Sequence, residues 1–192
     1  GSAYAIVAIG SDFSIIGNNI TTVSNGPNLA IFFPSRMGAP CDVVISDNFM
    51  NVTGLATSAH DTGLVSGIEV QTGNIELSGN TIYTYNIGDY DDDNYLFGVS
   101  YVQDGLNSKW NITDNTIFTE GKYAISLKSA DDAVITDNTL YAHKFKGDKA
   151  VFIGDGNDNV VENNVENYEE YNDLKWCEFI KPSLEMKYGD DI

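Results

Sequence analysis

The chain has 192 residues, of which 42% are hydrophobic, so it can bury the core of one domain and is unlike a disordered protein. Its 28 acidic residues against 10 basic ones give a formal net charge of −18. A surface with that charge repels nucleic acids and anionic membranes, so neither is an expected partner. No apolar run approaches the ~18 residues of a membrane-spanning helix, so we expect no membrane insertion.

A short motif with a central asparagine recurs along the chain. It consists of an apolar residue, a small or polar residue, then Asp, Gly or Asn, then asparagine, followed closely by another apolar residue. The copies at 112–117 and 135–140 read Ile-Thr-Asp-Asn-Thr-Ile and Ile-Thr-Asp-Asn-Thr-Leu. Successive copies lie 23 to 35 residues apart, which is the spacing of a structural repeat. The recurring asparagines are Asn19, Asn48, Asn80, Asn115, Asn138 and Asn164.

Each repeat contains three short runs in which apolar and polar residues alternate, as at 67–70, 75–77 and 82–84. Such alternation with β-branched and aromatic residues is typical of strands, and no stretch has a helical period. We therefore predict an all-β fold, a right-handed parallel β-helix (solenoid) of about six coils with three short strands per coil. Residues 1–172 form this solenoid, and 173–192 form a C-terminal cap or a linker toward a following domain.

The recurring asparagine has a structural interpretation. Asp, Gly or Asn directly before it suits a left-handed backbone position in a sharp turn between the second and third strands. The asparagine side chain can then point inward and bond both the turn backbone and its counterpart in the next coil. The sequence thus predicts an asparagine ladder that keeps coils of unequal length in register.

The copies of Ile-Thr-Asp-Asn-Thr-Ile resemble the repeats of the pectate-lyase-like β-helix superfamily. The acidic composition, rich in Asn, Thr and Tyr with more lysine than arginine, is similar to that of adhesin-like surface proteins of methanogenic archaea. This resemblance implies a non-catalytic module of a larger secreted, anchored protein that binds a glycan or protein on another cell surface. Two alternatives stay open: a polysaccharide-active lyase, hydrolase or epimerase of the superfamily, and a passive structural spacer.

In the enzymes of that superfamily, the resemblance implies, chemistry takes place on the outward face of the first strand of each coil. A glycosidase needs two carboxylates there, and a lyase needs a base beside a positive group. Glu69 is the one titratable residue on this face, so we expect no catalytic residue. By strand alternation the outward residues are Ala8, Phe32, Glu69, Ser100, Ser126 and Phe152.

Two acidic segments suggest calcium, because oxygen-rich clusters with glycine bind hard cations. The alternative is a solvated acidic turn, and the fold requires no cofactor. If the turns of neighbouring coils stack, their carboxylates combine. The candidate calcium ligands are Asp91, Asp92, Asp93, Asp131, Asp132, Asp155, Asn157 and Asp158.

Aromatic and outward residues are the candidates for binding a partner. Exposed rings beside Asp and Asn would form a carbohydrate-binding face, whereas buried rings would be structural. We expect the chain to be a monomer, extracellular and at the cell surface. The candidate ligand-binding residues are Phe32, Glu69, Tyr85, Tyr90, Tyr95 and Phe152.

Overall fold

The structure is a computed structural model, and its described part forms eighteen short strands in three six-stranded parallel sheets. It describes residues 1–10, 12–34, 42–56, 63–88, 95–102, 108–142 and 150–166. The proposed cap or linker at 173–192 lies outside these residues. No helix among them is long and apolar enough to cross a membrane.

The sheets, here named A, B and C, take the first, second and third strand of each coil. Sheet A contains β1 (Ala3–Val7), β4 (Asn28–Phe33), β7 (Val65–Val70), β10 (Leu96–Tyr101), β13 (Tyr123–Ser129) and β16 (Val151–Asp155). Sheet B contains β2 (Phe13–Ile16), β5 (Asp42–Ser46), β8 (Asn74–Ser78), β11 (Lys109–Thr113), β14 (Val134–Thr136) and β17 (Val160–Glu162). Sheet C contains β3 (Asn19–Ser24), β6 (Phe49–Gly54), β9 (Thr81–Asn86), β12 (Thr116–Thr119), β15 (Thr139–Ala142) and β18 (Val165–Glu166).

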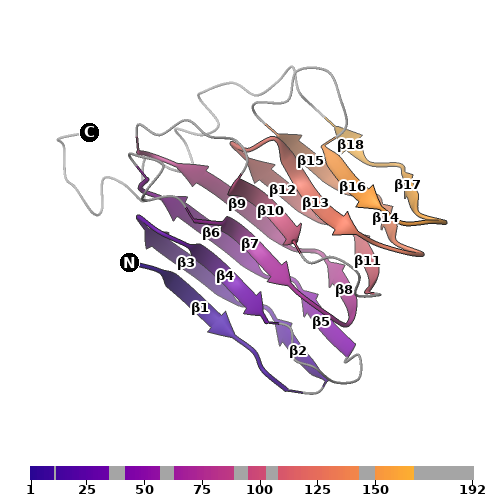
Figure 1. The fold of residues 1–192 in the computed structure, drawn as a ribbon, viewed down its shortest axis with the longest axis horizontal. Helices are drawn as coiled ribbons and strands as arrows, with labels where there is room; N and C mark the ends of the chain where they lie inside the picture. Colours follow the sequence, from indigo (N-terminus) through magenta and orange to yellow (C-terminus); the bar gives the residue numbers. More distant parts are fainter. Residues whose placement is uncertain are drawn as a thin grey trace.

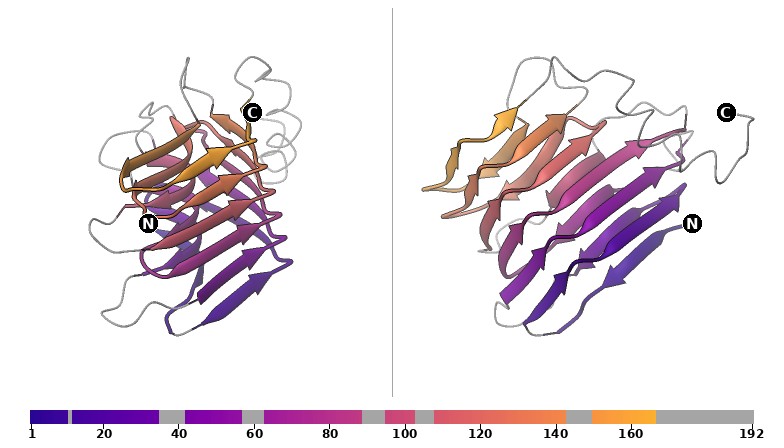
Figure 2. Two further views of the ribbon diagram at one scale, coloured as in Figure 1. Left: turned by 90° about the vertical axis from the view of Figure 1, so that its right-hand side faces the viewer. Right: turned by 180° about the vertical axis from the view of Figure 1, so that it is seen from behind.

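The chain passes through sheets A, B and C in turn and then starts the next coil on top of the last (Figures 1 and 2). Each strand pairs in parallel with its equivalents in the neighbouring coils. The predicted right-handed parallel β-helix with six coils and three strands per coil is therefore confirmed.

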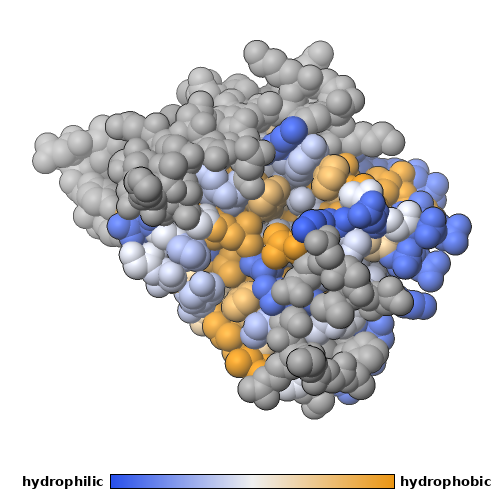
Figure 3. Space-filling view, in the orientation of Figure 1, coloured by the Kyte–Doolittle hydropathy of each residue, from blue (hydrophilic) through white to orange (hydrophobic). Residues whose placement is uncertain are grey.

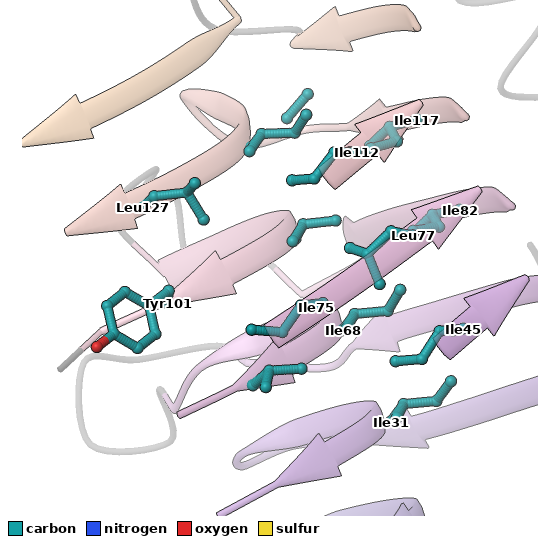
Figure 4. Close-up of a cluster of buried hydrophobic side chains, with 14 of the residues drawn as sticks. Ile31, Ile45, Ile68, Ile75, Leu77, Ile82, Tyr101, Ile112, Ile117 and Leu127 are labelled. Atoms are coloured by element: carbon teal, nitrogen blue, oxygen red, sulfur yellow. The ribbon is translucent and has the colours of Figure 1, made fainter. Parts of the chain in front are cut away.

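The core consists of apolar columns that run along the solenoid axis. In sheet B, Ile45, Leu77 and Ile112 follow one another in register, each fully buried. Figure 4 shows these side chains pointing between the sheets, beside others such as Ile82 and Ile117 of sheet C. Burial of each such side chain contributes about 1.5–3 kcal/mol, but only because stacked coils exclude water from both sides of it.

The turn between sheets B and C has a left-handed residue in each coil, as predicted in five coils and one position earlier than predicted in the first. These residues, each directly before a ladder asparagine, are Gly17, Asp47, Gly79, Asp114, Asp137 and Asn163, with φ between 56° and 69°. Glycine has no steric penalty there, and Asp or Asn tolerates the conformation better than other residues. The turn therefore points the next side chain into the solenoid.

The asparagine ladder is present and runs in one direction. The backbone N–H and Nδ2 of Asn80 both donate to Oδ1 of Asn115, at 3.0 and 2.9 Å. The same Nδ2 donates to the Ile45 carbonyl of the preceding coil at 2.8 Å. Each of the four inner ladder asparagines thus binds three coils together and satisfies turn groups that would otherwise be buried without partners.

The first member of the ladder corrects the sequence analysis. Asn19 was expected there, but Asn18 makes the ladder bonds, donating to Oδ1 of Asn48 from its backbone N–H at 2.9 Å and from Nδ2 at 3.0 Å. Asn19 begins β3, pairs with Phe49 and is exposed. The remaining five asparagines, from Asn48 to Asn164, are placed as predicted.

Sheet A bends because two consecutive positions in each coil face the interior. A Cβ at Gly67 would overlap Cγ2 of Ile82 in sheet C, and one at Gly98 would overlap Cγ2 of Ile117. The residue after each small one, such as Ile68, also belongs to the core. The residues before and after each inward pair, which are three positions apart in the chain, therefore lie on the same outer face. The row of small residues is Ala30, Gly67, Gly98, Ala124 and Ala150.

We expect Asn80→Ala to lower the free energy of unfolding by about 2–5 kcal/mol, because buried donors of Asn48 and the Ile45 carbonyl lose their partner. Denaturant unfolding monitored by circular dichroism measures it. Asn111→Ala is the matched control, because Asn111 is exposed on the outer face of sheet B. Equal losses in the two variants would contradict a stabilising ladder.

Candidate functional site

One outer row of sheet A brings together three of the residues proposed to bind a ligand. Phe32 is in register with Glu69, and Phe152 ends the same row three coils later. Ser100 and Ser126 lie between them, as predicted. The complete row, here called the outer row, is Val7, Phe32, Glu69, Ser100, Ser126 and Phe152.

The first position of this row also corrects the sequence analysis. Val7, not Ala8, is in register with Phe32. Ala8 packs against the core instead, while Val7 is exposed. Alternation gives the wrong residue because the bend of sheet A shifts the inward and outward positions by one.

The centre of the outer row is polar but buried. Glu69 is only 3% exposed, and its Oε1 accepts a hydrogen bond from Nε2 of Gln71 at 2.8 Å. Burial raises the pKa of the Glu69 carboxyl, and the bond from Gln71 lowers it by less. A carboxyl held this way can donate a proton or a hydrogen bond at a higher pH than an exposed glutamate can.

Two serines complete this polar centre. Oγ of Ser100 donates to Oγ of Ser66 at 3.1 Å, and Oγ of Ser66 donates to the Ile68 carbonyl at 3.0 Å. Both hydroxyls are fully buried. The hydroxyls of Ser66 and Ser100 come together because sheet A bends. The bend puts the residues before and after each inward pair on the same outer face.

Pairs of aromatic rings lie at both ends of this face. The ring centroids of Tyr4 and Phe32 are 5.6 Å apart, and those of Tyr123 and Phe152 are 5.0 Å apart and stacked. Tyr4 and Phe152 are 44% and 39% exposed, so solvent reaches both pairs. Figure 3 shows this side of the molecule, with hydrophobic residues in orange running diagonally across its described part.

The tyrosines proposed as ligand contacts do not form an exposed surface. Tyr85 is 1% exposed, and Tyr95 is also buried and belongs to the core cluster. Their rings therefore do not meet the expectation of solvent-accessible stacking surfaces. Tyr90 lies outside the described residues.

The outer face of sheet C has an aromatic column that is better explained by stability than by binding. Rings of Phe49, Tyr83, Phe118 and Tyr141 follow one another over four coils, with the last three stacked at 4.9 and 4.4 Å. Rings stacked on one another along the axis cover each other's faces, and Tyr83 in the column is only 7% exposed. A sugar that stacks on an aromatic face finds none between them.

The two acidic turns at 131–132 and 155–158 stack on neighbouring coils, the arrangement in which the sequence analysis expected their carboxylates to combine. The Asp132 N–H donates to the Asn157 carbonyl at 3.1 Å, and Oδ1 of Asp131 accepts from the Asn157 N–H at 2.9 Å. Asp131 is thereby engaged with the backbone. No group of three or more His, Cys, Asp or Glu residues suited to a metal occurs in the described part of the chain. Asp91, Asp92 and Asp93 lie outside it.

An open depression of about 440 Å³ lies on the outer face of sheet B and was not predicted from the sequence. Across it, Nζ of Lys109 lies 3.9 Å from Oδ2 of Asp132, an exposed ion pair that contributes little stability. Applying alternation to the second strand of each coil, and not only the first, would have located these positions. Its polar lining residues are Asp42, Asn74, Glu76, Lys109, Asn111 and Asp132.

Comparison with protein-family models, with curated proteins and with solved structures found no match to this chain. The fold and the outer face of sheet A therefore carry the functional argument by themselves. Fold alone does not determine function, so the residues of this face are the basis for proposing one.

We expect Glu69→Gln to raise the melting temperature at neutral pH. Because its pKa is raised, Glu69 holds its proton more tightly in the folded state than in the unfolded state. Ionisation of Glu69 therefore lowers the free energy of unfolding at pH values above its ordinary pKa of 4.5. Glutamine keeps the acceptor for Gln71 without that cost, and each kcal/mol regained raises the midpoint by about 2–4 °C. At about pH 3.5 residue Glu69 is protonated in both the folded and the unfolded protein, so the gain in melting temperature disappears.

Calorimetry at the two pH values measures the difference. Glu76→Gln is the control, because Glu76 is an exposed glutamate on sheet B and should change the midpoint little at either pH. A Glu69→Gln protein that melts lower than the parent at neutral pH, or gains equally at both, would contradict the argument.

Calcium binding at the stacked turns stays a prediction. Binding to the folded state at a hundredfold excess over Kd would add about 2.7 kcal/mol, or about 5–10 °C in melting temperature. Melting curves with calcium and with EDTA measure this shift. Asp131→Asn/Asp155→Asn should abolish it, whereas an unchanged midpoint in the parent protein rules out a stabilising ion.

Proposed function

We propose that this β-helix is a non-catalytic binding module of an adhesin-like, extracellular cell-surface protein. Its partner is a glycan or protein on another cell, and it contacts that partner through the outer face of sheet A. The observation that carries the proposal is the pair of solvent-accessible aromatic clusters, Tyr4 with Phe32 and Tyr123 with Phe152, on one face of a regular scaffold.

Contiguous exposed apolar groups often mark contact surfaces, and aromatic side chains are enriched in binding interfaces. Phe32 and Phe152 are separated by four strand spacings, or about 19 Å. An elongated partner, such as an oligosaccharide or an extended peptide, can reach both clusters at once. Lys122, whose Nζ lies 5.4 Å from the ring of Tyr123, adds a cation at one end.

The non-catalytic part of the proposal rests on the composition of the outer row. Glu69 has Phe32 and Ser100 as its neighbours there, so no second carboxylate or cation stands beside it in that row. A glycosidase mechanism uses two carboxylates on either side of the bond that breaks. Secretion and surface location are proposed from the acidic, Asn- and Thr-rich composition.

A polysaccharide-active enzyme is the second candidate, favoured by the raised pKa of Glu69. A buried carboxyl that holds its proton is the type of group that acts as a general acid. The passive spacer remains the third alternative, and it requires only the rigid stacking already described.

Glycan-array binding and pulldown of cells decide among the three. We expect Phe32→Ala/Phe152→Ala to weaken binding at least tenfold, which corresponds to about 1.4 kcal/mol or more. Phe49→Ala is the control, since Phe49 is an equally exposed phenylalanine on sheet C. No binding in either assay would overturn the proposal in favour of the spacer.

The enzyme is tested on the same preparation. Incubation with pectin, alginate and other uronate polymers is followed by measuring unsaturated or shortened products. Turnover that Glu69→Gln abolishes and Glu76→Gln retains would replace the binding module with the enzyme.

A further inference from the structure

Three asparagines of the chain stand in the sequence Asn-x-Thr, the acceptor motif (sequon) for N-linked saccharides: Asn19, Asn51 and Asn111. An attached saccharide is bulky and hydrophilic, so a folded protein accommodates it only where the amide reaches solvent. Asn19 and Asn111 are exposed, whereas Asn51 on sheet C is only 6% exposed. Asn111 is the sequon whose neighbouring strands are described on both sides, because β11 lies between β8 and β14.

Strand β11 turns the acceptor amide of this sequon outward. Trp110 and Ile112 are buried in the core, so alternation along the strand places Asn111 and Thr113 together on the outer face of sheet B. Within the part of the chain that the structure describes, the Asn111 amide makes no hydrogen bond. Nδ2 of Asn115, by contrast, donates to three acceptors in the ladder. The Asn111 amide is therefore available for modification without loss of a structural contact.

Space for a saccharide lies directly beside this amide. Asn111 lines the open depression of about 440 Å³ on sheet B, with Glu76 in register on one side and Val134 on the other. The exposed Glu76 carboxylate can accept hydrogen bonds from saccharide hydroxyls. Covering Val134, which is 38% exposed, removes apolar surface from water. The surroundings of Asn111 thus suit a hydroxyl-rich group attached at that position.

We propose that Asn111 is a glycosylation site, so that the chain carries a saccharide covalently attached to the outer face of sheet B. The site rests on the extracellular location in the proposed function, because N-linked saccharides mark secreted proteins. In the transfer, Nδ2 of Asn111 bonds to the anomeric carbon of a saccharide activated as a diphosphate ester. The bond from that carbon to the diphosphate oxygen breaks, the diphosphate leaves with the electron pair, and Nδ2 loses one proton.

The modified face is separate from the face proposed to bind a partner. Asn111 belongs to sheet B, whereas Phe32 and Phe152 lie in the outer row of sheet A. A saccharide on sheet B is hydrophilic and keeps that side of the solenoid hydrated. Removal of the saccharide should therefore leave partner binding through sheet A unchanged.

Mass spectrometry of tryptic peptides tests the site on the protein isolated from the cells that make it. Trypsin cuts after lysine and arginine, which places the three sequons in separate peptides, 1–36, 37–109 and 110–122. We expect peptide 110–122 to carry the added mass of a saccharide. Peptide 37–109 should be unmodified, because Asn51 is buried.

Variants of the sequon identify the modified atom. Asn111→Gln and Thr113→Ala should each abolish the added mass on peptide 110–122, whereas Thr113→Ser keeps the required hydroxyl and should retain it. Thr136→Ala is the matched control, because Thr136 is in register with Thr113, is similarly exposed and belongs to no sequon. Melting curves that match the control verify that the variants fold.

An unmodified peptide 110–122 in every cell fraction overturns the site, and so does an added mass that survives Thr113→Ala. Modification of Asn51 to the same extent also overturns it, since exposure would then not decide which sequon is used. Glycan-array binding by a protein with an unmodified Asn111 overturns the site and leaves the binding module in place. A modified Asn111 on a protein that binds neither glycans nor cells supports the site and overturns the binding module.

Discussion

The hydrogen bonds of the inward asparagine are the constraint on which the rest of the molecule depends. Coils of 23 to 35 residues differ mainly in their loops, and loops give no common reference for stacking. The ladder supplies one, because the amides of Asn48, Asn115 and Asn138 each bond their own turn, the coil before and the coil after. A buried amide that lost one of these partners would be costly, so slippage of a single coil is strongly opposed.

From this register follow the surfaces that can act on other molecules. Side chains from segments far apart in sequence, such as Phe32 and Glu69, become neighbours in one row because their coils are aligned at the turn. The small residues beside Ile82 and Ile117 then bend sheet A and bring buried hydroxyls and exposed rings to the same face.

Much of the fold was predictable because repeats encode it locally. The motif, its left-handed residue and the inward asparagine were recognised from residues adjacent in the chain, and five of six ladder positions were right. The first failed because Asn18 and Asn19 both fit the motif, and only the pairing of Asn19 with Phe49 separates them. Val7 was missed because alternation assumes a straight strand, whereas sheet A bends.

The sequence by itself thus determined the fold class, the number of coils and the outward direction of most side chains in the first strand, because period-2 alternation and turn preferences are local properties. Only the tertiary structure decided which outward residues meet solvent. Glu69 lies in the outer row yet is buried, Tyr85 is buried as well, and Phe152 is exposed. Exposure depends on what packs over a position, and no pattern within one strand records that.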